Sequence, residues 1–381
     1  MPTPLRIAFR ADASATLGAG HLTRCLALAV HLREHGAQCM FVCRQEDGSL
    51  HSLVASAGFA LRLLPVSGEV AASRRAPPAP AHAPPAPAHV PPAPAQACAF
   101  NWRADAEHTL ACLGDTMPDW LIVDHYGIDA KWERLVRPAC RWLMVIDDLA
   151  NRGHGCDLLL DQNLDRSARD YHLLVPAQAR VLAGAHYALL RPEFREWRAH
   201  SLGRRARFRL QHLLISLGGS DQVDATCSVL ETLAQCTFHD GLRVAVVVGH
   251  GSARLDRVRA AALRLPWPTE VLVGVHNMAE RMASSDLAIG AAGGTAWERC
   301  ALGLPSLVVV LAENQRGVAE ALARHGAALV VSDPREIGCA LRGLQDASGE
   351  ERLQAMSGAA SQLVDGAGAG RVCQELLAFH A

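Results

Sequence analysis

The sequence predicts an α/β protein with two domains of similar size, each built on a parallel sheet that helices cover on both faces. The chain has 381 residues, which is more than one ordinary hydrophobic core serves. Short apolar runs alternate with segments whose apolar residues recur every three or four positions, as strands alternate with helices in a parallel sheet. This alternation occurs twice, on either side of a basic stretch at 201–209.

The first alternating series begins with an apolar strand at 5–9 and a helix at 20–36. Residues 165–206 are less regular and interrupt the alternation. The other elements expected in this half are strands at 37–43, 59–65, 119–127 and 141–150, and helices at 51–58, 105–114 and 131–139.

The second series begins with FRLQHLLISLGGSD (208–221), a strand that ends in a glycine turn, and a helix at 224–236. The predicted domains are 1–200 and 207–365, followed by a C-terminal helix at 366–381. The remaining elements expected are strands at 242–249, 269–275, 286–294, 305–311 and 327–331, and helices at 278–285, 295–303 and 314–326.

A Pro/Ala-rich insert at 76–97 interrupts the first domain. Residues 76–96 read APPAPAH, APPAPAH, VPPAPAQ, three copies of a seven-residue unit. Alternating proline and alanine bury little apolar surface and favour extended polyproline II. A docking arm for a proline-recognising partner is the alternative, but a tolerated expansion of a disordered surface loop is the preferred interpretation.

Composition excludes several classes of function. The formal net charge of −1 gives no electrostatic footprint for nucleic acid or an anionic membrane. The 12 cysteines form no CxxC pair, so a structural metal site is not expected. The one lysine, Lys131, is not part of a GK[ST] motif, which excludes a Walker A loop. No signal or spanning segment is found, so we expect a cytoplasmic monomer without metal or cofactor.

The turn between the first strand and the first helix carries an unusual histidine. It contains Gly18 and Gly20, but Thr23 stands where a dinucleotide-binding GxGxxG motif has its third glycine. His21 follows the paired glycines directly, where the backbone approaches a ligand and an imidazole can exchange a proton near neutral pH. A capping or packing role is the alternative for His21, but its setting favours a site.

Polar side chains also follow two other strands of the first domain. Asp124, His125 and Tyr126 come at one strand end, and Asp147 and Asp148 at the next. The carboxyl ends of parallel strands are where open α/β sheets bind ligands. Such acids equally often cap the next helix or turn. The two interpretations are evenly matched for the pair 147–148, whereas 124–126 favours a site.

The second domain has two glycine turns that lie between a strand and a helix. Their backbone N–H groups can hold a diphosphate without a charged side chain. Glu298, one helical turn beyond the second glycine turn, can accept both hydroxyls of a ribose, although its alternative is a favourable interaction with the helix dipole. Asn314 and Gln315 follow another strand, and helix capping by Asn314 competes with a ligand contact. The residues of the two turns singled out here are Gly219 and Ser220 in the first and Gly293, Gly294 and Thr295 in the second.

An ordered set of motifs resembles the UDP-sugar hydrolases of pseudaminic acid biosynthesis, and it runs along nearly the whole chain outside the insert. That family removes UDP from UDP-2,4-diacetamido-2,4,6-trideoxy-β-L-altropyranose and is similar in architecture to two-domain GT-B glycosyltransferases. The motifs are RADAS (10–14), GAGHLTRCLALA (18–29), DHYGID (124–129), DDLANRGHGCDLLLDQN (147–163), YALLRPEF (187–194), LISLGGSD (214–221), IGAAGGTAWERCALGLPSLVV (289–309) and AENQ (312–315).

The resemblance implies roles for several of these residues. His21 matches the family's water-activating base, and Tyr126 matches a residue of the sugar site. Glu298 and Asn314 match uridine- and substrate-binding positions, and the glycine turn at 290–294 matches the diphosphate loop. Asp12, Gln315 and the glycines of the other turns are expected to line the same site.

The implied reaction is metal-independent hydrolysis of a UDP-linked diacetamido sugar, with inversion and cleavage of the anomeric C–O bond. The product would supply a nonulosonic acid for flagellin glycosylation or a surface polysaccharide. Two domains facing each other across a cleft are the implied architecture. The alternatives are a GT-B glycosyltransferase that uses a UDP-amino sugar, a UDP-N-acetylglucosamine 2-epimerase, and a non-catalytic nucleotide-sugar-binding protein. A transferase of this fold often has a basic or apolar membrane-docking face on its first domain, and the sequence shows no clear one.

Overall fold

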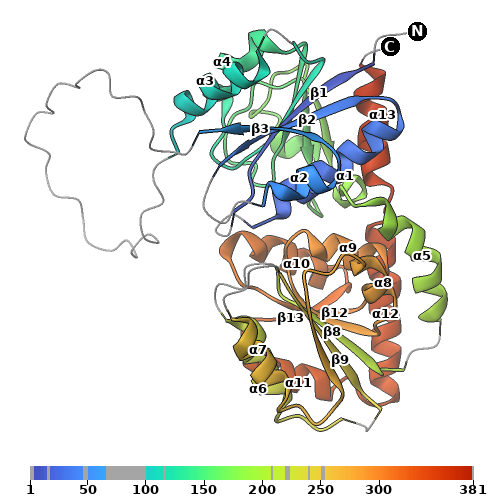
Figure 1. Ribbon diagram of the computed structural model, residues 1–381. Helices are drawn as coiled ribbons and strands as arrows, with labels where there is room; N and C mark the ends of the chain where they lie inside the picture. Colours follow the sequence, from blue (N-terminus) through green and yellow to red (C-terminus); the bar gives the residue numbers. More distant parts are fainter. Residues whose placement is uncertain are drawn as a thin grey trace, which may run out of the picture.

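The computed structural model describes two lobes, each a parallel sheet between layers of helices (Figure 1). The predicted insert at 76–97 lies outside the described residues. These are residues 4–14, 18–45, 50–65, 100–114, 117–206, 209–218, 224–238, 241–249 and 254–379.

The first lobe is built on a seven-stranded sheet in the order β3-β2-β1-β4-β5-β6-β7, in which all neighbouring strands are parallel. Every residue of β4 is buried, because helices cover the sheet on both faces. The strands are β1 (Arg6–Ala11), β2 (Gln38–Arg44), β3 (Ala60–Leu64), β4 (Trp120–Asp124), β5 (Trp142–Ile146), β6 (Leu158–Asp161) and β7 (Arg180–Ala183).

Two hydrophobic layers hold the helices of the first lobe to its sheet. Side chains of α1, α2 and the C-terminal α13 pack on one face, and those of α3 and α4 pack on the other. The elements are α1 (Gly20–Glu34), α2 (Ser52–Ser56), α3 (Trp102–Leu113), α4 (Ala130–Val136), α13 (Gly368–Ala378) and the short 3₁₀ helices η1 (Arg137–Ala139), η2 (Ala168–Tyr171) and η3 (Ala185–Tyr187).

The second lobe repeats this plan with six parallel strands in the order β10-β9-β8-β11-β12-β13. Helices α6, α7 and α11 pack on one face of the sheet, and α5, α8, α9 and α10 pack on the other. The strands are β8 (His212–Ser216), β9 (Arg243–Val248), β10 (Thr269–Val273), β11 (Leu287–Ala291), β12 (Ser306–Val309) and β13 (Ala328–Val331). The helices are α5 (Pro192–Arg204), α6 (Ala225–Leu233), α7 (Leu255–Ala262), α8 (Met278–Ala283), α9 (Thr295–Ala301), η4 (Glu313–Gln315), α10 (Arg316–Arg324), η5 (Pro334–Glu336), α11 (Ile337–Arg342) and α12 (Ala347–Leu363).

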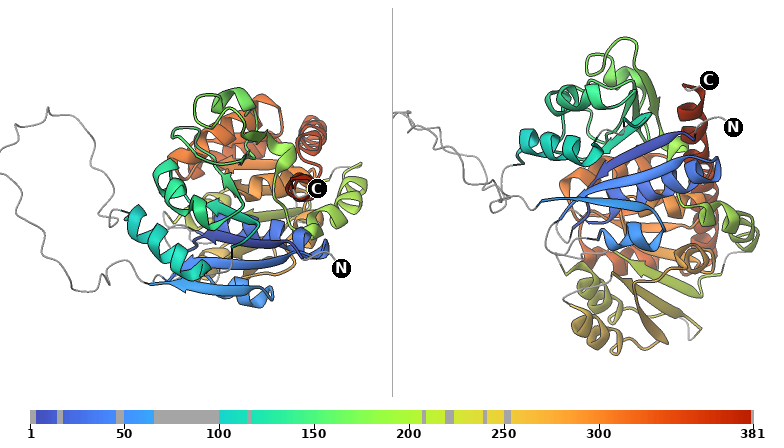
Figure 2. Two further views of the ribbon diagram at one scale, coloured as in Figure 1. Left: turned by 90° about the horizontal axis from the view of Figure 1, so that it is seen from above. Right: turned by 45° about the horizontal axis from the view of Figure 1, so that its top comes forward.

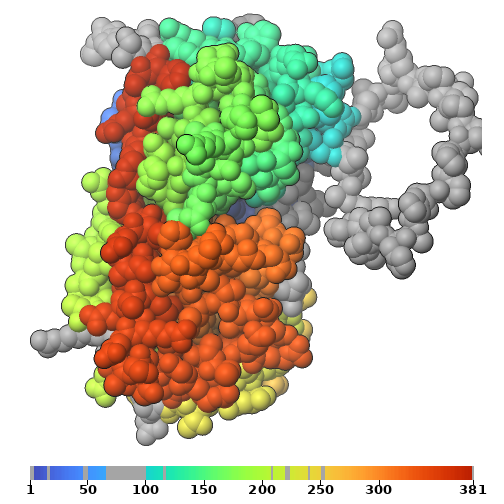
Figure 3. All heavy atoms as spheres, turned by 180° about the vertical axis from the view of Figure 1, so that it is seen from behind, coloured from blue at the N-terminus to red at the C-terminus, as the bar shows by residue number. Residues whose placement is uncertain are grey.

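Two segments connect the lobes on one side of the molecule (Figures 1 and 2). After β7 the chain crosses to α5, which packs on α8 and α9 of the second lobe. After α12 the chain returns, and α13 packs on α1 of the first lobe. From behind, the α12–α13 segment runs along both lobes (Figure 3). The predicted boundary at 200–207 therefore follows a helix that already packs on the second lobe.

The sequence-based prediction of two parallel α/β domains is confirmed, but no strand or helix was predicted within 165–206, the region described as less regular. Within that region the structure has strand β7 and the 13-residue helix α5. Helix α5 begins with Pro192, which suits a first helical position. Its sequence PEFREWRAHSLGR is largely polar and shows no strong apolar stripe, because only Phe194 and Ser201 are buried.

Strand order places one switch point in each sheet, where the chain changes direction across the sheet. In the first lobe it lies between β1 and β4, where Ala11 at the end of β1 pairs with Asp124. In the second lobe it lies between β8 and β11. Open α/β sheets bind ligands at the carboxyl side of such points. The segments that follow β1, β4, β8 and β11 are thereby the places to look for a site.

Two glycines of α13 provide a test of how this helix closes the fold. A Cβ on Gly368 would meet backbone atoms of η3, with Ala188 N only 2.6 Å away, whereas a Cβ on Gly370 would meet nothing within 4 Å. Gly368→Ala should therefore lower the free energy of unfolding by about 1–3 kcal/mol through overpacking. Gly370→Ala should raise it by about 0.5–1 kcal/mol through helix propensity. Urea denaturation of both variants measures the difference, and equal midpoints would contradict it.

Candidate functional site

His21 lies at the switch point of the first sheet. It is the second residue of α1, directly after the turn that follows β1, and it is largely buried. Its ring Nδ1 is 2.6 Å from Oδ1 of Asp124, the last residue of β4. Within the described part of the chain, Nε2 of His21 has no hydrogen-bond partner. Among the residues that the structure describes, the imidazole is thus held through one nitrogen, Nδ1.

Arg24, one turn along the same helix, grips the same carboxylate. Its Nε donates to Oδ2 of Asp124 at 2.6 Å, and its NH2 group donates to Oδ1 at 2.6 Å. Its NH1 group donates to both oxygens of Asp148, at 2.9 and 2.8 Å. Arg24 was not among the residues predicted from the sequence. Its spacing of three from His21, which puts both side chains on one helix face, was the available signal.

The charges around Asp124 fix its protonation state. Burial opposes ionisation of this carboxyl, but Arg24 and then His21 outweigh it and hold the pKa of Asp124 well below its usual range. An ionised Asp124 can only accept hydrogen bonds, so we assign the His21 proton to Nδ1. Nε2 then carries the lone pair of the neutral ring. This arrangement equips His21 to take a proton from a group placed beside Nε2.

Tyr126 borders this histidine. The two rings meet edge to face, with centroids 4.5 Å apart and an interplanar angle of 81°. The Tyr126 hydroxyl donates to Oδ2 of Asp148 at 3.2 Å, and the ring is 37% exposed. Burial and the neighbouring Asp148 raise the pKa of Tyr126. Tyr126 therefore stays a hydrogen-bond donor and forms a polar wall next to the imidazole.

The neighbouring carboxylates Asp147 and Asp148, which the sequence could not tell apart, have different environments. Asp147 is buried and accepts from the Ala150 amide at 2.8 Å and the Tyr171 hydroxyl at 3.0 Å. It therefore shapes the loop after β5. Asp148 is partly exposed and ties Arg24 to Tyr126. Asp148 belongs to the group around His21.

Asp12 lies beneath the opening turn and supports it indirectly. Arg10 donates to both of its oxygens, at 2.5 and 2.8 Å, and the Arg44 amide donates to Oδ1 at 2.7 Å. His125 faces Asp12 at 3.6 Å, and burial together with Arg10 lowers the pKa of His125 to about 4. His125 is thus a neutral packing group. Asp12 is buried with its oxygens already occupied, so any effect on a ligand passes through the turn.

Each of the two glycines expected in the opening turn has a geometric reason. Gly18 has φ of +77°, a conformation that side chains disfavour, and its amide donates to the carbonyl of Ser14 at 2.8 Å. A Cβ on Gly20 would meet nothing within 4 Å, so the backbone there is open to a close approach.

The second lobe presents its own glycine turn after β11. Cβ atoms on Gly293 or Gly294 would meet nothing within 4 Å. Thr295 begins α9, and the amides of Ala296 and Trp297 donate back to the carbonyls of Gly293 and Gly294 at 2.9 and 3.1 Å, which fixes the turn. Behind the turn, Arg299 is buried and donates to the Ala291 carbonyl at 2.8 Å and to the Thr295 hydroxyl at 3.2 Å. The predicted Gly219 and Ser220 of the other turn lie outside the described residues.

Glu298 lies in the first turn of α9, and its side chain is 11% exposed. Burial raises its pKa to about 7, against the attraction of Arg191 and Arg299. Arg191 is the nearest cation, with its NH2 group 3.8 Å from Oε1 of Glu298. Among the described residues, no protein group donates a hydrogen bond to this carboxylate. Its oxygens are available to donors of a ligand.

Asn314 and Gln315 lie in η4, after β12. Asn314 is exposed. Gln315 uses its Oε1 to accept from the Leu311 amide at 3.1 Å, so this side chain also fixes the end of the strand segment before it. Asn314 is therefore better placed than Gln315 to contact a ligand through its exposed side-chain amide.

The structure thus gathers the predicted residues into two groups, one on each lobe. His21 and Tyr126 lie together in the first, and the glycine turn, Glu298 and Asn314 follow the carboxyl ends of β11 and β12 in the second. Figure 1 shows α1 and α2 on the side of the first lobe that faces α9 and α10. An ion pair bridges the lobes near this level, where Asp165 meets Arg324 at 2.8 Å and His325 at 2.7 Å.

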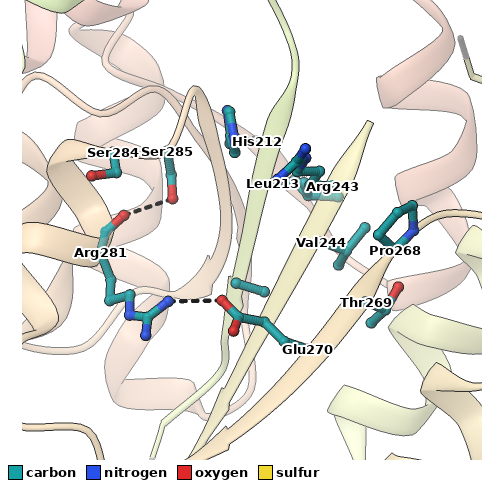
Figure 4. A pocket seen from close by; sticks show the side chains of 11 residues that line it. His212, Leu213, Arg243, Val244, Pro268, Thr269, Glu270, Arg281, Ser284 and Ser285 are labelled. Atoms are coloured by element: carbon teal, nitrogen blue, oxygen red, sulfur yellow. Dashed lines mark hydrogen bonds and ion pairs between the residues drawn. The ribbon is translucent and has the colours of Figure 1, made fainter. Parts of the chain in front are cut away.

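A separate hollow of about 400 Å³ lies at the other edge of the second sheet (Figure 4). It is lined by the first residues of three strands, His212, Arg243 and Thr269, and by the paired side chains of Glu270 and Arg281. These are the amino ends of β8, β9 and β10, opposite the edge that carries the glycine turn. The hollow is therefore not part of the two groups described above.

A smaller hollow of about 280 Å³ lies on the first lobe, between α3 and α4. Its lining combines three cations with two large apolar side chains: Trp102, Arg103, Lys131, Arg134 and Leu135.

In the described parts of the chain, no helix is long and apolar enough to span a membrane. Over the same residues, no cluster of three or more His, Cys, Asp or Glu side chains is arranged to hold a metal ion.

Comparison with known proteins shows a family match in the second lobe and a similar fold over the whole chain. Residues 213–365, the larger part of the second lobe, match the Glycosyltransferase family 28 C-terminal domain. The crystal structure of MurG from Acinetobacter baumannii superposes with a TM-score of 0.66 over 98% of this chain and 99% of that one, at 16% identity. The two lobes therefore have the GT-B fold.

Two relatives have sequence similarity to this chain. The UDP-2,4-diacetamido-2,4,6-trideoxy-β-L-altropyranose hydrolase of Campylobacter jejuni is 26% identical over 206 residues, which are 54% of this chain and 71% of the relative. The uncharacterized protein MJ1062 of Methanocaldococcus jannaschii is 24% identical over 324 residues. That match covers 82% of this chain but only 56% of the relative's length.

Removing the charge of Asp124 tests the group around His21. Asp124→Asn leaves the buried guanidinium of Arg24 with Asp148 as its charged partner and a neutral amide in place of Asp124, and should lower the free energy of unfolding by about 1–3 kcal/mol. The matched control is Asp129→Asn, because Asp129 caps α4 by accepting from the Lys131 amide and asparagine caps equally well. Chemical denaturation compares the two variants. Equal stability of both would show that the Arg24–Asp124 pair does not hold this edge of the sheet together.

Proposed function

We propose that this protein hydrolyses a UDP-linked 2,4-diacetamido-2,4,6-trideoxy sugar to UDP and the free sugar, as a step of pseudaminic acid biosynthesis. The observation that carries the proposal is the state of His21. Asp124 holds its Nδ1 at 2.6 Å, and Nε2 has no partner within the described residues. The similarity to the Campylobacter jejuni hydrolase supports the choice of substrate.

In this proposal the second lobe holds the nucleotide. Main-chain amides of the turn at Gly293 and Gly294 receive the diphosphate, and the Thr295 hydroxyl adds a donor. Glu298 accepts the ribose hydroxyls, and Asn314 contacts the sugar. Oriented N–H dipoles stabilise the charge that develops on UDP as it leaves, without a large rearrangement in the transition state. The proposed chemistry uses these groups and no metal ion.

The first lobe supplies the nucleophile. Nε2 of His21 accepts a proton from a water molecule, whose oxygen bonds to the anomeric carbon on the face opposite UDP. The bond between that carbon and the diphosphate oxygen breaks, and its electron pair leaves with UDP. Attack from the opposite face inverts the anomeric configuration. A positioned base of this kind contributes about 10²- to 10⁴-fold to the rate.

Asp124 and Arg24 prepare the histidine for this step. The carboxylate accepts from Nδ1–H and so orients the ring, and it stabilises the imidazolium once Nε2 has taken the proton. Arg24 keeps Asp124 ionised, because it outweighs the effect of burial. Asp148 holds both Arg24 and Tyr126, which keeps the aromatic wall in place. These five residues act as one prepared unit.

The first test is incubation with UDP-acetamido sugars and no acceptor. We expect UDP and free sugar in equal amounts, with inverted configuration detected by NMR at early times. In ¹⁸O-labelled water the label should enter the sugar, because water attacks carbon. Label in UDP would overturn the mechanism. A 2-epimer as product would indicate an epimerase, and no product would leave a transferase or a nucleotide-sugar-binding protein.

The second test replaces the proposed base. His21→Phe should reduce kcat by at least about 10²-fold, the contribution typical of general base catalysis. The Kd for UDP should change little, because the nucleotide is held by the other lobe. The matched control is His31→Phe, since His31 lies on the same helix and pairs only with Glu34, at 3.6 Å. Turnover that survives in His21→Phe would remove this residue from its role.

A glycosyltransferase that uses a UDP-amino sugar is the second candidate, and two observations favour it. The second lobe matches a glycosyltransferase family. The hollow between α3 and α4 provides cations beside Trp102, which suits an anionic, partly apolar acceptor or a membrane surface. In that case His21 would deprotonate an acceptor hydroxyl in place of water. Release of UDP that needs an added acceptor and yields no free sugar would favour this candidate.

A further inference from the structure

The segment that joins the lobes brings two partly buried charges, Arg191 and Glu193, close to Glu298 of the second lobe. Arg191 directly precedes α5, and its NH2 group lies between two carboxylates. It is 3.1 Å from Oε1 of Glu193 and 3.8 Å from Oε1 of Glu298. One guanidinium is therefore shared by a carboxylate of its own segment and a carboxylate of the second lobe.

These three side chains are shielded from water to different degrees. The Glu298 side chain is 11% exposed, and those of Arg191 and Glu193 are 32% and 31% exposed. Charges act over longer distances in such surroundings than in bulk water. A change in the charge of Arg191 or Glu193 therefore changes the electrostatic energy of the Glu298 carboxylate.

The charged groups that act on Glu298 come from two elements. Arg191 and Glu193 belong to the connecting segment, and Arg299 belongs to Glu298's own helix. Burial raises the pKa of Glu298 to about 7, Arg191 and Arg299 oppose the rise, and Glu193 adds to it. Arg299 is bound to the Ser306 hydroxyl at 3.0 Å and to the Ala291 carbonyl at 2.8 Å, so its position is fixed. Arg191 and Glu193 are therefore the charged groups near Glu298 that come from the segment joining the lobes and not from Glu298's own helix.

The ionisation of Glu298 determines what it can bind. An ionised carboxylate has two acceptor oxygens for the adjacent 2′- and 3′-hydroxyls of a ribose, and such charge-assisted hydrogen bonds are about twice as strong as neutral ones. A protonated carboxyl has lost this capacity on one oxygen. Ribose binding is thereby linked to the charge state of Glu298.

We propose that Arg191 and Glu193 act as positioning residues that set the ionisation of Glu298 in opposite directions, and so set the pH range in which the protein holds the ribose of its nucleotide. This inference rests on the role proposed above for Glu298. It assigns to the connecting segment a function in ligand binding that its position between the lobes alone does not imply. The arginine favours ribose binding at neutral pH, and the glutamate restrains it.

The measurement is the ratio of two dissociation constants, for UDP and for 2′,3′-dideoxy-UDP, by calorimetry across about pH 5.5–9. Both ligands carry the same diphosphate, so its own titration cancels in the ratio. We expect dideoxy-UDP to bind about ten- to a hundredfold more weakly at high pH, as for loss of hydrogen bonds to a charged group. Below about pH 7 the ratio should fall towards one, as Glu298 gains a proton.

Variants move the midpoint of this pH profile in opposite directions. Arg191→Met should move it to higher pH by about one unit, because a favourable positive charge is lost. Glu193→Gln should move it to lower pH, because a like charge is removed. Arg191→Lys keeps the charge and should stay close to the wild type. Arg195→Met is the matched control, because Arg195 is an exposed cation of the same helix, and it should move nothing.

The outcomes separate this inference from the proposed function. A wild-type ratio near one at every pH, with Glu298→Gln unchanged, means that Glu298 does not hold the ribose, and both ideas about this residue fall. A pH-dependent ratio that Glu298→Gln abolishes, with midpoints unmoved or moved in the same direction by Arg191→Met and Glu193→Gln, overturns only the inference. If Arg191→Met does not fold, Glu193→Gln and Arg191→Lys decide between the same outcomes.

Discussion

The ionised carboxylate of Asp124 is the constraint on which the first lobe's site depends. Strand β4 ends at this residue beside the end of β1, so the carboxylate lies where α1 begins. Helix α1 then places His21 and Arg24 one turn apart, facing it. A carboxyl so buried would take up a proton without a cation beside it. Arg24 prevents this protonation, so the ionised Asp124 remains an acceptor for the Nδ1 proton of His21.

The two lobes use buried carboxylates in different ways. Asp124 has short bonds from Arg24, and its pKa is far below the physiological range, so its charge does not vary with pH. Glu298 has no such short bond among the described residues, since the nearest guanidinium, that of Arg191, is 3.8 Å away, and burial raises its pKa to about 7. The first carboxylate is a permanent part of the scaffold. The second gains or loses its charge near neutral pH, as suits a group whose partners arrive with a ligand.

Periodicity and turn chemistry were enough to predict strands β1–β5 of the first sheet and all six strands of the second, because these strands are short, mostly apolar runs. Strands β6 and β7, of four residues each, were not predicted. Helix α5 was not predicted, because its sequence is largely polar and its packing depends on contacts with α8 and α9. His21 could be found because glycines flag the turn before it. The roles of Arg24 and Arg191 were not predicted, because each depends on a carboxylate more than 90 residues away in sequence, and the spacing of Arg24 from His21 indicates only a shared helix face. Side chains of consecutive residues diverge, so Asp147 and Asp148 acquired different partners only in three dimensions.

Whether water or an acceptor alcohol meets His21 is a question about space beside Nε2, because the same base serves both reactions. On one side that space is bounded by Tyr126, whose hydroxyl is held by Asp148 and whose ring stands edge-on to the imidazole. Across the lobes, Asp165 binds both Arg324 and His325 at the end of α10, the helix that follows Asn314. These side chains are exposed, so the bridge contributes about 0.2–1 kcal/mol to the contact between the lobes. The reaction therefore depends on which nucleophile occupies the space beside Nε2, and Tyr126 is the group of the first lobe that borders it.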